Sequence, residues 1–346
     1  MLISRKINQP VHPPLVFQGH TLQDVASHKH LGITFRSDLR WSTHIDDITS
    51  KADKLLNIMK SLKFRLDRQT LETIYISFIR PILEYGSPVW DGCTLNDVAK
   101  LEGVQLSAAR IVTGAFAGTA NAKLYEELGW ETLANRREKA KLTLMYKIQN
   151  NLVPNTFQSI VTSEQVPHDC NTRRRYDLPH FRARTDLFIN SFFPSTVRLW
   201  NELPFEIRNS ESLAIFKSKL YKRFPQPRVN AKLYNSGNRF LSILHTRLRL
   251  GSSQLNSHLY KIGLKPTPNC RCGALYEDVW HYIFACPLYT AERSTLHSLI
   301  SQYSSFSIQT VLYGSEKCTF QENILIFSAV QNYISQTSRF AAVGIG

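Results

Sequence analysis

The chain has 346 residues, of which 43% are hydrophobic, and its 42 Lys and Arg outnumber its 27 Asp and Glu to give a formal net charge of +15. This length allows two or three modules with packed cores, and the positive charge favours a polyanionic or acidic partner. No run of about 18 apolar residues and no signal-peptide core is present, so we expect a soluble intracellular protein, cytoplasmic or nuclear, that is neither secreted nor bound to a membrane.

The first forty residues predict short β-strands. PLVF (14–17), TLQDVA (21–26) and KHLGITF (29–35) are β-prone runs, and Gln18, Gly19 and His20 form a turn between the first two. We therefore expect a small antiparallel β element within residues 1–42.

After Trp41 the apolar residues recur at helical spacing, and residues 43–115 predict a three-helix bundle. Asn96 is the expected N-cap of the last helix, and Gly114 lies just past its end. The three sets of apolar positions are Leu55, Leu56, Ile58, Met59 and Leu62; Leu71, Ile74, Tyr75, Phe78, Ile79 and Ile82; and Val98, Leu101, Val104, Ala108, Ile111 and Val112.

Residues 116–170 predict a helical connector, with a long helix around Leu124 to Ile148. A basic, aromatic-rich region follows at 171–250, where sixteen Lys or Arg face five Asp or Glu. A solvated face is one interpretation of this charge, and phosphate binding is the other. We expect the arginines to contact phosphates and Phe188, Phe192, Phe193 and Trp200 mainly to pack in a core. The arginines are Arg173, Arg174, Arg175, Arg182, Arg184 and Arg198.

The last region, 251–346, holds three of the six cysteines within the stretch CRCGALYEDVWHYIFAC and ends in a helix-like run, QENILIFSAVQNYISQTSRF. The other cysteines show no pairing pattern, which favours a reducing compartment over a disulfide framework. Cys270, Cys272, His281 and Cys286 spell C-x-C-x8-H-x4-C. Thiolates with one imidazole form a common structural zinc site, so we expect these four residues to bind Zn²⁺.

The residues between the ligands favour this site over a chance cluster. Gly273 permits the tight turn that a one-residue gap requires, while Glu277 and Asp278 suit the positive end of a short helix. Trp280, Ile283 and Phe284 would form the apolar face of that helix. His281 and Cys286 lie about 140° apart on an ideal helix, so the helix must unwind near Cys286, where Pro287 ends it. Four protein ligands leave no open position for a catalytic water, which disfavours a zinc hydrolase.

Several of these segments together resemble one protein family. HKHLGITFRSDLRWSTHI (28–45) resembles the primer-grip segment, and the W-x-x-H-I after it, of reverse transcriptases from non-LTR (LINE-type) retrotransposons. KADKLLNIMKSLK, LETIYISFIRPILEYGSPVW and VAKLEGVQLSAARIVTG resemble the thumb of that family. SFFPSTVRLWNELP, RLRLGSSQLNSHLYKIG and the Cys/His cluster resemble its region after the thumb and its terminal zinc knuckle.

The resemblance implies a mainly α fold with a small N-terminal antiparallel β element, in which 1–42 is a palm remnant with a primer-grip-like hairpin and 43–115 a thumb-like bundle. The connector (116–170), the basic region (171–250) and the zinc-knuckle region with its C-terminal helix (251–346) follow. It also implies that Lys29, His30, Leu31 and Gly32 contact RNA or an RNA/DNA primer–template. His30 stands where the family usually has Tyr.

The catalytic carboxylates of the family are missing from this sequence. The F/Y-x-D-D motif, which binds two divalent ions, precedes the primer grip in the family, so the resemblance implies a truncated chain that neither binds catalytic Mg²⁺ nor polymerises alone. Asp46 and Asp47, the only adjacent aspartates, follow Trp41 and His44 at the expected start of a thumb helix and lack the required aromatic residue.

Three alternatives stay open. The chain could be a zinc-containing protein-interaction module whose basic surface only maintains solubility, or a non-functional relic of an element. It could also act in a polymerase by assembling with an intact copy of the parent element's protein, which would supply the aspartates.

Overall fold

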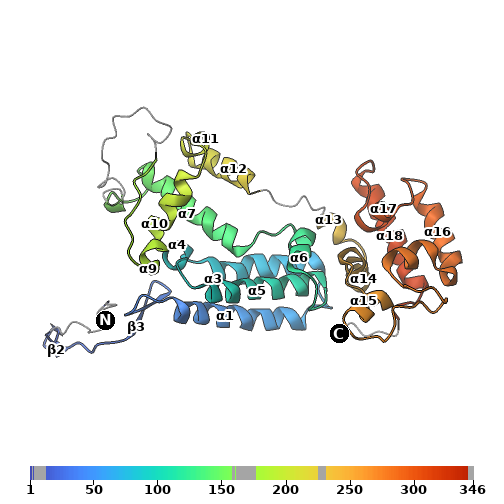
Figure 1. Cartoon of the computed structure of the whole chain (residues 1–346), viewed down its shortest axis with the longest axis horizontal. Helices are drawn as coiled ribbons and strands as arrows, with labels where there is room; N and C mark the ends of the chain where they lie inside the picture. Colours follow the sequence, from blue (N-terminus) through green and yellow to red (C-terminus); the bar gives the residue numbers. More distant parts are fainter. Residues whose placement is uncertain (2, 4–12, 158–159, 161–176, 225–230, 342–346) are drawn as a thin grey trace. The chain divides into compact units, whose positions relative to one another are not determined.

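The computed structural model describes residues 1, 3, 13–157, 160, 177–224 and 231–341 (Figure 1). These residues are mostly helical, with two small antiparallel sheets near the N-terminus, as the sequence predicted. They form two compact units: unit 1 comprises Met1–Lys54, Ile79–Gln105 and Glu131–Gln226, and unit 2 comprises Leu55–Phe78, Leu106–Trp130 and Pro227–Gly346. No helix in the described part of the chain is long and apolar enough to cross a membrane.

The first sheet joins β1 (Val16–Phe17) to β2 (His20–Thr21) through the predicted turn. Its strands are shorter than the predicted runs. The second sheet pairs β3 (Ser27–His30) with β4 (Ile33–Arg36).

The prediction of one strand over residues 29–35 was wrong, because the chain reverses at Leu31 and Gly32. Both residues have positive φ, +46° and +82°, as the central pair of a tight hairpin turn requires. Leu is unusual in this conformation. The Tyr85 hydroxyl donates a 3.0 Å hydrogen bond to the Leu31 carbonyl oxygen and holds the turn.

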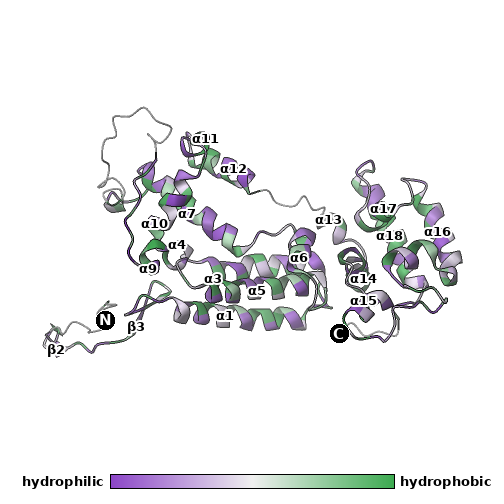
Figure 2. Ribbon diagram, viewed as in Figure 1, coloured by the Kyte–Doolittle hydropathy of each residue, from purple (hydrophilic) through white to green (hydrophobic). Residues whose placement is uncertain are grey.

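Helix α1 (Ser42–Ser61) begins thirteen residues before the first apolar position used to predict it. Hydrophobic and hydrophilic residues alternate along it (Figure 2). One face of the helix is buried, and that face is mixed, with polar His44 and small Ala52 among larger apolar residues. The buried residues of α1 are His44, Ile45, Ile48, Thr49, Ala52, Leu56 and Met59, spaced as on one helical face.

The second predicted helix consists of α2 (Arg68–Ile74), a π-helical turn η1 (Tyr75–Ile79) and α3 (Arg80–Glu84). Pro81 has no N–H to donate, so regular helical bonding cannot continue through this turn. A short helix, α4 (Ser87–Trp90), was not predicted.

The third predicted helix is α5 (Leu95–Thr113), and Gly114 follows its end as expected. The predicted N-cap was wrong: Thr94, two residues before Asn96, accepts a 3.2 Å hydrogen bond from the Asp97 N–H. Its hydroxyl in turn donates to the Asp97 carboxylate at 2.8 Å.

The long helix predicted around Leu124 to Ile148 is two helices, α6 (Asn121–Leu128) and α7 (Leu133–Gln149). Gly129 takes the left-handed conformation, φ +66°, and ends α6. The Thr132 hydroxyl caps α7 by accepting from the Asn135 N–H at 3.2 Å.

The core of unit 1 lies where α7 packs against α10 (Phe192–Asn201) and α12 (Leu213–Arg223). Tyr146 stacks on Phe216 with ring centroids 4.4 Å apart. Trp200 is buried in this core, and Phe192 and Phe193 pack against it, as predicted. The prediction that Phe188 is buried was wrong, since its side chain on α9 (Asp186–Ile189) is 44% exposed. Helix α11 (Phe205–Arg208) connects α10 to α12.

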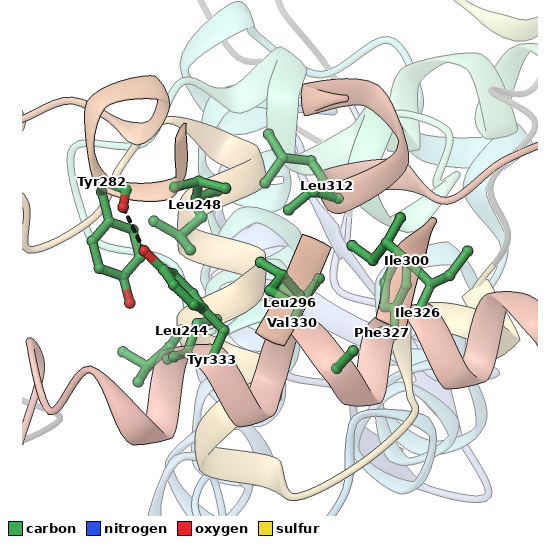
Figure 3. Packing of buried hydrophobic residues seen from close by; sticks show 14 of the residues in the cluster. Leu244, Leu248, Tyr282, Leu296, Ile300, Leu312, Ile326, Phe327, Val330 and Tyr333 are labelled. Carbon is green, nitrogen blue, oxygen red and sulfur yellow. Dashed lines mark hydrogen bonds between the residues drawn. The ribbon is translucent and has the colours of Figure 1, made fainter. Parts of the chain in front are cut away.

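Unit 2 has its own core, built around the C-terminal helix α18 (Phe320–Gln336), which was predicted (Figure 3). Its N-terminus carries a capping box formed by Thr319 and Glu322. Tyr333 of α18 donates a 2.5 Å hydrogen bond to the Tyr282 carbonyl oxygen. The other elements are α13 (Ala231–Tyr234), α14 (Arg239–Leu250), α15 (Asn256–Lys261), η2 (His281–Ala285), η3 (Pro287–Tyr289), α16 (Thr290–Ile300) and α17 (Ile308–Tyr313).

Candidate metal centre and nucleic-acid interface

The four predicted metal ligands meet in space. Their ligand atoms all lie within 4.8 Å of one another. The Cys270 and Cys286 sulfurs are 3.8 Å apart, and the Cys272 sulfur is 3.3 Å from His281 Nε2. A tetrahedral zinc site with Zn–S bonds of about 2.3 Å has sulfur–sulfur edges of roughly 3.8 Å. The cluster could therefore hold a metal ion, and its donor set and spacing are compatible with zinc.

Two local structures bring the ligands together. Cys270 and Cys272 flank a tight turn in which the Gly273 N–H donates to the Cys270 carbonyl oxygen at 3.1 Å, and Gly273 has φ +94° as expected. His281 opens the π-helical turn η2, and the Cys286 N–H donates to its carbonyl oxygen at 2.7 Å. This wider turn and the extended backbone at Cys286 provide the unwinding that the five-residue spacing requires.

Burial controls the protonation of the thiols when no metal is bound. Cys270 and Cys286 are buried, which raises the pKa of both, that of Cys270 to about 12. The Ala274 N–H, which donates to the Cys272 sulfur, lowers the pKa of Cys272. Since zinc binds thiolates, metal binding must release protons from the two buried thiols.

Asp278 lies at the N-terminal end of the helical turn as predicted, and its carboxylate accepts a hydrogen bond from the His281 N–H at 2.7 Å. The role predicted for Glu277 was wrong. Its buried carboxylate receives two hydrogen bonds from Arg339, at 2.6 and 2.5 Å, and one from the Asn256 N–H at 2.8 Å. These bonds tie the metal loop to α15 and to the segment after α18.

The apolar face predicted for η2 is also partly wrong. Ile283 is buried and Phe284 packs against the core, but Trp280 is 60% exposed. Tyr282, which was not predicted, is the fully buried residue, and its hydroxyl lies 2.7 Å from the Thr337 hydroxyl. The metal centre is thus continuous with the core of unit 2.

The β3–β4 hairpin is fixed to α1 through Thr34. The Thr34 N–H donates to His44 Nδ1 at 3.3 Å, and its hydroxyl donates to the Asp47 carboxylate at 2.9 Å. Burial lowers the pKa of His44, which keeps it a neutral acceptor. The turn itself points outward, with Leu31 75% exposed.

This docking gathers three exposed lysines, Lys29 of β3 with Lys51 and Lys54 of α1. The neighbouring ammonium of Lys29 lowers the pKa of Lys51, and Lys54 adds to the effect. Of these, only Lys29 was predicted as a site residue. Lys51 and Lys54 were missed because they lie more than twenty residues along the chain, although the helical spacing places Lys51 at the flank of the buried stripe of α1 and Lys54 on the opposite side.

The predicted arginines are only partly described. Arg173, Arg174 and Arg175 lie outside the described residues. Arg182, Arg184 and Arg198 are exposed and belong to unit 1, in the segment that packs against α7.

The two adjacent aspartates lie in α1, and each one binds a residue of another element. Asp46 forms a 2.5 Å ion pair with Lys100, and Asp47 accepts from Thr34. They lie in the second turn of a helix and not on a strand hairpin.

Comparison with known proteins gives three relatives, all from Drosophila melanogaster. The chain is 24% identical over 287 residues to a putative 115 kDa protein of the type-1 retrotransposable element R1DM, covering 81% of this chain and 26% of that protein. It is 22% identical over 170 residues to a probable RNA-directed DNA polymerase from the transposon X-element, covering 48% of this chain and 18% of that protein.

The third relative, a probable RNA-directed DNA polymerase from the transposon BS, is 24% identical over 131 residues, which are 37% of this chain and 14% of that protein. No family model matches the chain. No solved structure matches it either. The chain spans about a quarter or less of the length of these relatives. These similarities agree with the motif resemblance: over part of its length the chain is similar to two probable RNA-directed DNA polymerases of transposons and to a protein of a retrotransposable element.

Proposed function

We propose that the chain is a nucleic-acid-binding C-terminal segment of a non-LTR retrotransposon reverse transcriptase, and that it holds an RNA or RNA/DNA primer–template without polymerising. The relatives support the link to reverse transcriptases. The observation that carries the proposal is the cluster of Lys29, Lys51 and Lys54 beside the β3–β4 turn.

The physical argument rests on charge. Like charges held side by side repel, and a phosphate backbone removes this repulsion while releasing its own counterions. The tip of the hairpin is exposed at Lys29, His30, Leu31 and Gly32, whereas Thr34 contacts α1. In this proposal the hairpin acts as a primer grip and the helices of 43–115 act as the thumb.

The remaining predicted residues have supporting roles in the proposal. The exposed Arg182, Arg184 and Arg198 contact phosphates, together with Arg173 to Arg175. Zn²⁺ bound by Cys270, Cys272, His281 and Cys286 has a structural role, since all four ligands come from the protein.

Charge reversal of the hairpin cluster tests the proposal. We expect K29E and K51E each to weaken binding of a labelled RNA/DNA primer–template about tenfold at low salt, measured by fluorescence anisotropy. K317E makes the same change of net charge at an exposed residue outside the cluster and should leave affinity within about twofold. Wild-type affinity should fall steeply with salt.

Two outcomes contradict this proposal. If wild type shows no binding at low ionic strength, the chain is not a nucleic-acid-binding segment. If K29E, K51E and K317E behave alike, the hairpin is not the contact.

A zinc-containing protein-interaction module is the second candidate. It is favoured by exposed apolar side chains beside the metal centre, Leu275, Tyr276 and Trp280, which are 72%, 63% and 60% exposed. A defined protein partner whose binding is lost in W280A, while primer–template binding persists, would support it.

A further inference from the structure

A groove in unit 1, which no residue of the β3–β4 hairpin lines, has the chemistry of a second binding site. It has a volume of about 430 Å³ and lies along α7 and α12 beside the start of α4. Its lining includes five cations and two acids. The cations are Arg136, Arg137, Lys139, Lys147 and Lys217, and the acids are Glu84 and Glu131.

Both acids are already neutralised within the protein. Glu84 pairs with Arg136, and Glu131 pairs with Lys139. Lys147 and Lys217 form no ion pair with any residue that the structure describes. The groove therefore presents positive charge that no internal carboxylate balances.

A buried donor in the groove wall also lacks an acceptor. Arg137 is 3% exposed, and its Nε donates to the Asp91 carboxylate at 2.7 Å. Its Nη1 has no hydrogen-bond partner in the described part of the chain. An unsatisfied buried donor costs about 1–3 kcal/mol, so the Arg137 guanidinium stands in the groove wall with one hydrogen bond that folding leaves unmade.

The lining residues form continuous stripes. Arg136, Ala140, Thr143 and Lys147 recur at helical spacing along α7, so the stripe runs for about 16 Å from the Arg136–Glu84 ion pair to Lys147. On α12, Lys217 and Tyr221 are one turn apart. Tyr221 is 51% exposed and has the Lys139 ammonium 4.3 Å from its ring centroid.

An extended anion with planar groups matches these features better than a single small anion. The distance along α7 exceeds the size of one phosphate, and an exposed tyrosine ring is a platform on which bases stack. We propose that this α7–α12 groove binds a single-stranded stretch of nucleic acid, with Lys147 and Lys217 contacting phosphates and Tyr221 stacking on a base. The inference rests on the proposed function, because it requires that the chain binds nucleic acid.

A local reporter tests the groove independently of the hairpin. In Y221W, a labelled short oligothymidylate should quench the fluorescence of the introduced tryptophan, with the same midpoint as its anisotropy change. K147E and K217E, introduced singly into Y221W, should each shift that midpoint about tenfold, whereas K317E should not. K217R should retain binding, and circular dichroism should show that each variant is folded.

The outcomes separate the two proposals. If anisotropy reports binding but the tryptophan fluorescence of Y221W is unchanged, or if K147E and K217E bind as tightly as K317E, the groove is wrong and the proposed function stands. If the wild type binds no oligonucleotide, both fail. If polyglutamate displaces the oligonucleotide at lower concentration than unlabelled oligothymidylate does, the groove is an acidic-protein site and the inference is overturned. K29E should leave the quenching at saturation unchanged.

Discussion

His245 on α14 shows how burial alone fixes a protonation state. The side chain is about 1% exposed, its Nε2 lies 2.9 Å from the Val311 carbonyl oxygen, and its ring packs 4.6 Å from that of Phe327. Burial first, and then the positive charge of Arg249, lower its pKa to about 3. His245 is therefore neutral in the folded protein, with Nε2 as the donor.

This shift predicts a loss of stability in mild acid. In the unfolded chain His245 titrates near its ordinary pKa of about 6.5, so below this pH the unfolded state binds a proton that the folded state does not. The contribution of neutral His245 to the free energy of unfolding is therefore complete above about pH 6.5. Below that pH it falls by about 1.4 kcal/mol per pH unit towards pH 3. Urea denaturation at pH 7.5 and 5.5, followed by hydrogen exchange of α14 and α18 amides, should show this difference.

H245Q is the matched variant, since its amide can still donate to Val311 but does not titrate. The difference between the two pH values should shrink by about 1.4 kcal/mol in this variant. An unchanged difference would show that other groups cause the acid sensitivity. Glu127 does not titrate between pH 7.5 and 5.5. Although burial raises its pKa, the charges of Arg249 and Arg68 outweigh this effect and lower it. Its contribution to stability is therefore lost only at pH values below its ordinary pKa of about 4.5.

At the scale of elements, local spacing predicted more than long-range packing did. Cys270, Cys272, His281 and Cys286 fall within seventeen residues, so their spacing was sufficient to identify the cluster. The partner of Glu277 is Arg339, 62 residues away, and no periodicity marks it. For this reason the sequence assigned Glu277 to a helix end, whereas the structure buries it in an ion pair with Arg339.

The β3–β4 hairpin and the α7–α12 groove show the same difference between local patterns, which the sequence reveals, and long-range contacts, which it does not. The motif resemblance placed a hairpin at Lys29 to Gly32, whereas the β-prone pattern predicted one strand, because Leu31 is not a usual turn residue. The α7–α12 groove was not predicted, since it requires Lys147 and Lys217 to meet across two helices.

The metal centre yields a prediction for the segment that carries it, residues 268–289, and for α18, against which that segment packs. Tyr282 follows His281 directly and packs against Tyr333 and Phe340 of the unit 2 core. Loss of the metal should therefore loosen residues 268–289 and also α18. We expect chelation, or the C286S substitution, to remove bound zinc. The loss of zinc should destabilise the folded metal-binding segment by on the order of 10 kcal/mol.

The measurement is zinc content by atomic emission together with hydrogen exchange of the Tyr282 and α18 amides. C318S is the control, because Cys318 is a half-buried cysteine outside the cluster. Full zinc content in C286S, or unchanged exchange after chelation, would contradict the assignment.

For the whole molecule, the net charge of +15 is shared among separate surfaces. Many basic residues are internal: Arg247 is about 1% exposed, and its Nε donates to the Gly114 carbonyl oxygen at 2.8 Å, just past the C-terminus of α5. Arg247 thereby complements the C-terminus of α5, and a basic residue buried as deeply as this one is not available to a ligand. The exposed hairpin lysines and the groove lysines are the ones that can contribute to salt-dependent binding.

The last prediction concerns catalysis by the whole chain. Polymerisation requires carboxylates that hold two divalent ions around the attacking and leaving oxygens. The sequence has no F/Y-x-D-D, and the adjacent Asp46 and Asp47 lie on α1, where they bind Lys100 and Thr34. The purified chain should therefore bind a primer–template and yet incorporate no nucleotide with Mg²⁺ or Mn²⁺.

A primer-extension assay with labelled nucleotides measures this, and D46N/D47N provides the control for the adjacent pair. Wild type and D46N/D47N should both give no extended product while retaining their affinity for primer–template. Extension that is present in wild type and lost in D46N/D47N would assign the metal-binding role to α1. Extension that persists in both would mean that other carboxylates of this chain bind the ions, and either result would overturn the proposal that the chain grips a strand without lengthening it.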